Sequence, residues 1–149
     1  MGRRGEGWFV VQLVLFAAIL LSPPVPPVAF PLWLRILGLG MLVVGGVFGT
    51  GGVLALGRNL TAFPKPIEGG TLITTGMYSV VRHPIYTGLI LGTLGLGIFR
   101  ASLLGIVLAA VLFIFFDLKS RREEKWLVEA YSGYVDYQKR VKKLIPWVY

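Results

Sequence analysis

Residues Ile85–Phe116 read IYTGLILGTLGLGIFRASLLGIVLAAVLFIFF, and only Arg100 interrupts this apolar run with a charge. As one helix, at about 1.5 Å per residue, the run would extend well beyond a bilayer core of about 30 Å. We therefore expect the chain to turn at Phe99-Arg100-Ala101-Ser102. The result would be a tight helical hairpin of two membrane spans, residues 85–99 and 101–116.

Two further apolar stretches, Trp8–Leu21 and Leu32–Leu56, precede this hairpin. Only the second easily reaches the roughly 20 residues that a span needs, so the others must borrow flanking residues. Charged residues make up 15% of the 149 residues, against about a quarter in soluble domains. Ser22-Pro-Pro-Val-Pro-Pro follows the first stretch in place of a small-residue cleavage site, which favours a retained span over a signal peptide. We expect one all-α domain, residues 1–149, forming a polytopic membrane bundle of four transmembrane helices, with spans at about 8–21, 32–56, 85–99 and 101–116.

The distribution of basic residues predicts the orientation of this bundle. The net charge is +8. Four spans with the N-terminus inside place every Lys and Arg except Arg35 and Arg100 on the cytoplasmic side, as the positive-inside rule requires. Residues 57–84 then form a cytoplasmic loop and residues 117–149 a cytoplasmic tail, whereas three spans would export the basic tail. We expect an integral protein of a prokaryotic cytoplasmic membrane, with both termini cytoplasmic and its basic residues facing anionic lipid rather than nucleic acid.

The tail is too polar to span a membrane but carries helical signals. We expect one helix from about Lys119 to Tyr131 and a second from Tyr134 to Val141, separated by Ser132-Gly133. The chain has no cysteine and one histidine, His83. Thiolate sites and multi-histidine sites are therefore excluded, and no metal is expected.

Polar and aromatic side chains gather just before the third span, in the run Gly76–Gly88 (GMYSVVRHPIYTG). Pro84 suits the first position of a helix and disfavours helix at His83, which places His83 near the N-cap with Arg82 before it. The free backbone N–H groups of such a helix start suit an anionic group, for instance a ligand carboxylate. The alternative is that Arg82 and His83 are interfacial anchors and that Tyr86 belongs to an aromatic belt.

A second polar run, Arg121–Leu127 (RREEKWL), lies in the expected tail helix. Glu123 and Glu124 point about 100° apart on a helix, so only one of them is expected to face the bundle. That carboxylate would bind ribose hydroxyls or the amine of a nucleotide-like cofactor. Alternatively, both belong to a solvated helix and are balanced by the neighbouring Arg and Lys.

Glycines at helical spacing predict close contacts between helices. Gly88 and Gly92 have the small-xxx-small spacing in the third span, and the same spacing occurs in the second span. Gly95 and Gly97 are the glycines that best suit the approach of a cofactor to the backbone.

Two blocks of this sequence resemble the isoprenylcysteine carboxyl methyltransferase and phospholipid methyltransferase superfamily. The first block is Leu72–Tyr78 (LITTGMY) followed by Val81–Gly88 (VRHPIYTG). The second is Glu123–Leu127 with Tyr134, Tyr137, Arg140 and Ile145-Pro146. The resemblance runs from about Leu56 to Tyr149. It implies an S-adenosylmethionine-dependent membrane methyltransferase whose cofactor site combines the ends of membrane helices with the C-terminal segment.

The resemblance also implies roles for particular residues. The cofactor pocket would be lined by Tyr78, His83, Pro84, Tyr86, Gly88 and Glu124, with His83 and Glu124 at a water-accessible interface. Gly95-Leu96-Gly97 is similar to the G-x-G that phospholipid methyltransferases use for the same cofactor. Arg82, Glu123 and Arg140 would orient the substrate or close the site.

The implied acceptor is small and hydrophobic or lipid-like: an isoprenylcysteine carboxylate, a thiol or a phospholipid amine. The sequence leaves the acceptor and the oligomeric state open. Two alternatives to a methyltransferase are a non-catalytic membrane scaffold or binding protein and a nicotinamide-dependent membrane reductase.

Overall fold

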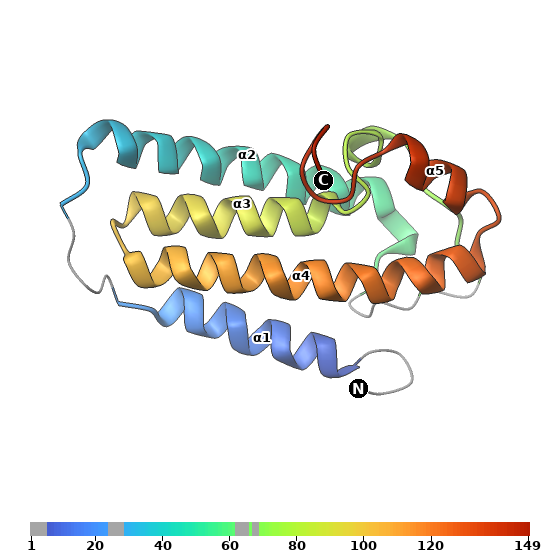
Figure 1. The fold of residues 1–149 in the computed structure, drawn as a ribbon, viewed down its shortest axis with the longest axis horizontal. Coiled ribbons are helices and arrows are strands. Elements are labelled where there is room, and N and C mark those ends of the chain that lie inside the picture. The colour runs from blue at the N-terminus through green and yellow to red at the C-terminus, as the bar shows by residue number, and fades with distance from the viewer. Residues whose placement is uncertain (1–5, 24–28, 62–65, 67–68) are drawn as a thin grey trace.

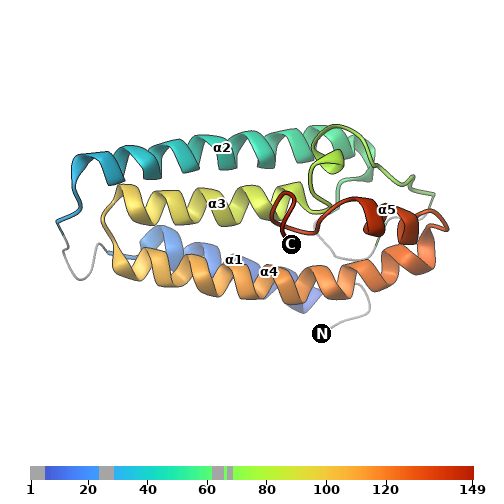
Figure 2. The same cartoon turned by 45° about the horizontal axis from the view of Figure 1, so that its top comes forward.

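The structure is a computed structural model of the chain and describes residues 6–23, 29–61, 66 and 69–149. Four long helices lie side by side, and a short helix covers one end of the bundle (Figures 1 and 2). The described residues contain no β-strand, only an isolated bridge between Val81 and Lys142, so the all-α prediction is confirmed. The elements are α1 Glu6–Leu21, α2 Leu32–Leu56, the 3-10 turns η1 Gly57–Asn59 and η2 Gly76–Ser79, α3 Pro84–Phe99, α4 Leu103–Ala130 and α5 Tyr134–Arg140.

Helix α3 is the central helix, since it packs against α2 on one side and α4 on the other, while α1 packs against α4. The α2–α3 contact depends on glycine, because a Cβ at Gly88 would lie 2.5 Å from the Gly45 carbonyl oxygen. A Cβ at Gly95 would likewise lie 2.5 Å from the Gly38 oxygen, and one at Gly97 would lie 2.9 Å from the backbone of α4. The small-residue spacing therefore predicts the helix contacts correctly.

The predicted turn at residues 99–102 is confirmed. Helix α3 ends at Phe99 and α4 begins at Leu103. Ala101 takes a positive φ of 51°, which reverses the chain. Ser102 is the N-cap of α4, and its Oγ accepts a hydrogen bond from the Gly105 N–H at 3.0 Å.

Helix α4 is longer than predicted, because the expected span 101–116 and the expected tail helix 119–131 form one continuous helix. No Pro or Gly lies between Asp117 and Ala130, and the charged side chains at the junction find partners. Asp117 Oδ2 lies 2.7 Å from Nη2 of Arg121 one turn on, and Lys119 donates to Gln12 Oε1 of α1 at 2.6 Å. The change from apolar to polar residues at Asp117 therefore does not end the helix. It marks the point along α4 where the side chains begin to contact polar partners. The second tail helix is confirmed as α5, which buries Tyr134 and Tyr137.

The outer surface of the bundle is apolar. Leu20 of α1 is 68% exposed and Leu54 of α2 is 75% exposed, among many large apolar side chains that the protein leaves uncovered. By length and composition, α4 and the helical stretch Leu32–Asn59 can cross a membrane, whereas α1 and α3 are shorter apolar helices of 16 residues each. The architecture is therefore that of a membrane protein, and the count of four spans stays a prediction.

Candidate active site

The start of α3 is held by the C-terminal segment. The Arg82 N–H donates to the Lys142 carbonyl at 2.8 Å, and the His83 N–H donates to the Lys143 carbonyl at 3.1 Å. Pro84 takes the first helical position after His83, as predicted. Two consecutive residues of the first sequence block are thus fixed by two consecutive residues near the other end of the chain.

Glu124 of α4 contacts the side chains of both Arg82 and His83. Its Oε1 accepts from Arg82 Nε at 2.8 Å and lies 3.1 Å from His83 Nε2, and its Oε2 accepts from Gln138 Nε2 at 3.1 Å. Arg82 also donates from Nη1 to the carbonyl oxygens of Gln138 and Val141. His83 is buried and Glu124 largely so, which corrects the expectation of a water-accessible location for both. Charges removed from water need partners, and this ion pair offsets part of the cost of burying both groups.

Glu123 faces the same histidine from its other edge. His83 Nδ1 lies 3.8 Å from Glu123 Oε2, and that oxygen accepts a hydrogen bond from Tyr86 OH at 2.8 Å. The expectation that only one of the two glutamates points inward is therefore wrong. Two side chains about 100° apart can both reach one imidazole ring, because its two nitrogens lie on different edges. The His83 and Tyr86 rings stack at 5.3 Å, and Tyr86 stacks in turn on Phe116 at 4.4 Å.

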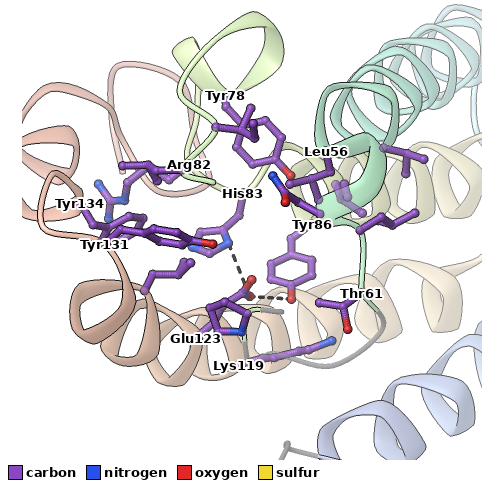
Figure 3. A pocket seen from close by; sticks show the side chains of 18 of the residues that line it. Leu56, Thr61, Tyr78, Arg82, His83, Tyr86, Lys119, Glu123, Tyr131 and Tyr134 are labelled. Atoms are coloured by element: carbon purple, nitrogen blue, oxygen red, sulfur yellow. Dashed lines mark hydrogen bonds and ion pairs between the residues drawn. The ribbon is translucent and has the colours of Figure 1, made fainter. Parts of the chain in front are cut away.

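These groups border a cavity of about 260 Å³ at the end of the bundle that carries η2 and α5. Figure 3 shows the labelled side chains arranged around it, with Tyr78 opposite Glu123. Burial, together with the charge of Glu123, raises the pKa of the Tyr78 phenol above its ordinary value, so this hydroxyl stays protonated. Five of the predicted site residues line the cavity: Tyr78, Arg82, His83, Tyr86 and Glu123.

The other predicted residues do not line this cavity. Glu124 contacts Arg82 and His83 but does not itself border the cavity. Pro84 packs against Gly52 of α2. Arg140 is exposed, and its Nε donates to the Asp136 carbonyl at 3.3 Å. The three glycines lie in contacts between helices, since carbonyl and amide groups of neighbouring backbones occupy the space beside them: Gly88, Gly95 and Gly97.

One stripe along α4 and its C-cap supplies three cavity residues beside Glu123 that the sequence reasoning missed: Lys119, Leu127 and Tyr131. Lys119, Glu123, Leu127 and Tyr131 follow one another at intervals of four and all line the cavity. The i, i+4 spacing was the signal that could have found them, since all four positions lie within the expected helix from about Lys119 to Tyr131. Lys119 is 2% exposed, and its Nζ lies 5.2 Å from the centre of the Tyr86 ring. In Figure 3 its ammonium end points away from Glu123, toward the segment that carries Thr61.

One buried hydroxyl beside the cavity lacks a hydrogen-bond partner within the described part of the chain. Among the described residues, Tyr134 OH is a buried side-chain atom without a hydrogen-bond partner, and Tyr134 lines the cavity. Buried polar groups are normally paired, so such an atom calls for a ligand or water. A carboxylate, phenol hydroxyls and several aromatic faces thus surround one cavity.

The fold and the cavity together define an all-helical membrane protein with an aromatic-lined cavity, bordered by charged side chains, at one end of its bundle. A profile of the phospholipid methyltransferase family matches residues 33–133. The chain belongs to this family.

Individual relatives agree with that assignment. Protein-S-isoprenylcysteine O-methyltransferase B of Arabidopsis thaliana is 29% identical over 120 residues, which cover 78% of this chain and 61% of the relative. Cobalt-zinc-cadmium resistance protein CzcN of Cupriavidus metallidurans is 35% identical over 80 residues, which cover 53% of this chain and 37% of the relative. The solved structure of isoprenylcysteine carboxyl methyltransferase, a eukaryotic intramembrane Ras methyltransferase, gives a TM-score of 0.71 at 25% identity, covering 96% of this chain and 50% of that one. This chain thus spans less than two thirds of the length of these relatives.

Proposed function

We propose that the protein is an S-adenosylmethionine-dependent methyltransferase that acts on a lipid-like acceptor at the cytoplasmic face of a membrane. The observation that carries the proposal is the junction of two cavities. Val53, Ile85 and Leu89 line both the polar cavity and an apolar groove of about 610 Å³ between α1, α2 and α3. A water-soluble donor and an apolar acceptor could therefore meet at this wall.

The polar cavity is the proposed donor site. When bound, S-adenosylmethionine supplies a methyl group on a positively charged sulfur. The Glu123 carboxylate suits the cationic part of this ligand, and the hydroxyls of Tyr78 and Tyr134 suit its polar groups. Arg82, His83 and Glu124 form the buried frame that holds Tyr86 and Glu123 in place.

The apolar groove is the proposed acceptor site. It is lined by large side chains of all three helices, and its wall also includes four glycines of the α2–α3 contact: Gly45, Gly49, Gly88 and Gly92. Methyl transfer is an in-line displacement, so positioning and exclusion of water supply much of the rate. A carboxylate or thiolate acceptor needs no general base, and we assign none to His83. Lys119 lines the polar cavity and not this groove, so its ammonium suits the carboxylate of the donor rather than a group of the acceptor.

A methyl-transfer assay with radiolabelled donor tests the proposal. We expect transfer to a prenyl-thiol carboxylate by the purified full chain in lipid nanodiscs, and we expect Lys119→Met to weaken donor binding without changing the choice of acceptor. No transfer to the carboxylate, the thiol or a phospholipid amine by folded protein that binds the donor would leave the scaffold alternative. Binding of NADPH in place of S-adenosylmethionine would support the reductase.

A further inference from the structure

The backbone of the first site block depends on a segment without helical structure. Lys142 and Lys143 accept the hydrogen bonds of the Arg82 and His83 amides, and the Leu144 carbonyl accepts one from Thr87 Oγ1 at 2.7 Å. Three consecutive carbonyls therefore align residues at the start of α3. Whatever holds this segment in place also sets the position of Arg82 and His83 in the cavity wall.

Asp117 of α4 holds the segment. Its Oδ1 accepts hydrogen bonds from Lys143 Nζ and from Tyr149 OH, the latter at 2.7 Å, and its Oδ2 accepts from Arg121 Nε at 2.8 Å. Asp117 is 9% exposed and Lys143 is 7% exposed, so the pair is shielded from water. Lys143 Nζ also lies 4.6 Å from the centre of the Tyr149 ring, which joins the three side chains into one cluster.

The segment closes on itself around this cluster. The Tyr149 carbonyl oxygen accepts from the N–H groups of Leu144 and Ile145 at 2.7 and 2.6 Å, and the Tyr149 N–H donates to the Ile145 carbonyl at 3.0 Å. Residues 144–149 thus form one closed, hydrogen-bonded loop, and Asp117 anchors it to the bundle. Asp117 lies outside the set of residues that line the donor cavity, so it acts on a ligand there only through other residues.

We propose that Asp117 is a positioning residue: through Lys143 and Tyr149 it fixes the C-terminal segment, which in turn fixes the backbone of Arg82 and His83 in the donor cavity. The link to donor binding rests on the function proposed above. The same helix α4 supplies Glu124 to the side chains of this pair. It therefore holds Arg82 and His83 twice, by their side chains directly and by their amides through Asp117.

Asp117→Asn in the full chain tests this role, with Asp136→Asn as the matched control because Asp136 forms an exposed ion pair with Lys139. We expect donor affinity and KM for the donor to worsen about tenfold with kcat at saturating donor retained, as for other couplings through a packed network. Lys143→Met should act in the same direction. The double variant should bind no more weakly than the weaker single variant, because both changes remove one linkage.

Amide hydrogen exchange supplies a readout that needs no ligand. We expect Asp117→Asn to accelerate exchange at Arg82 and His83, while the α2–α3 contact stays protected. Unchanged exchange at these two amides, or faster exchange throughout the bundle, would overturn the proposal. If Asp117→Asn does not fold, Tyr149→Phe removes one of the same hydrogen bonds and must show the same local effect. If the unaltered protein binds no donor, the proposed function fails while the exchange result still decides the role of Asp117.

Discussion

At the scale of single residues, Glu124 binds three polar or cationic side chains from two different parts of the chain. Arg82 and His83 precede α3, Gln138 comes from α5, and all three meet the same carboxylate. A buried charge pair contributes little net stability while intact, but breaking it leaves an uncompensated charge. Glu124 therefore serves the fold as well as the site.

Replacing Glu124 should expose this double role. We expect Glu124→Gln to lower the free energy of unfolding by about 3–5 kcal/mol, because the Arg82 charge loses its buried partner, and to weaken donor binding at the same time. Thermal unfolding and donor titration measure the two effects. Glu129→Gln, at an exposed position of the same helix, should change neither. If Glu124→Gln changes neither the free energy of unfolding nor donor affinity, this carboxylate has neither of the two proposed roles.

The unpartnered hydroxyl of Tyr134 allows ligand binding to be separated from stability. Tyr134→Phe removes a buried group that has no partner among the described residues, so we expect unchanged or slightly higher stability. Donor affinity should fall by about fivefold to tenfold, the scale of one hydrogen bond. In contrast, Tyr137→Phe removes a hydrogen bond to the Tyr78 carbonyl and should lower stability. Equal donor affinity for Tyr134→Phe and the unaltered protein would place the ligand elsewhere.

At the scale of elements, the sequence predicts helices better than it predicts what their side chains meet. The bounds of α2 match, and the 99–102 turn is confirmed, because an apolar run of known length, a charge and a small residue report on local structure. The unbroken course of α4 was missed, since polarity at Asp117 resembles the end of a span. The inward placement of both Glu123 and Glu124 depends on which groups α3 and α5 present to them, and local sequence carries no such information.

The α2–α3 contact yields a prediction about packing. We expect Gly88→Ala to lower stability by about 1–3 kcal/mol, because its Cβ would meet the backbones of Gly45 and Gly49 at 2.5 Å. Gly40→Ala is the matched control in α2, since a Cβ there meets no described atom within 4 Å. Thermal unfolding in detergent compares the two. A destabilisation that is the same for both variants would show that helix propensity, and not close packing, decides the outcome.

At the scale of the whole molecule, the proposed four spans place the connection between α1 and α2 on the outer side and the α4–α5 connection in the cytoplasm. The chain has no cysteine, so single cysteines report topology cleanly. We expect Ala29→Cys to react with a membrane-impermeant maleimide in intact cells, and Ser132→Cys to react only after permeabilisation. If α2 and α4 alone cross the membrane, both cysteines would lie on one side and react alike.

The proposed methyltransferase activity depends on donor binding in the cavity beside Glu123 and Tyr134. Titration of the purified full chain with S-adenosylmethionine and with its demethylated product measures it most directly. We predict one site per chain for both ligands, with affinity weakened by Tyr134→Phe and by Glu123→Gln and unchanged by Glu129→Gln. A folded protein that binds neither ligand, or that binds both equally well after the Glu123 and Tyr134 substitutions, would contradict the assignment of this cavity.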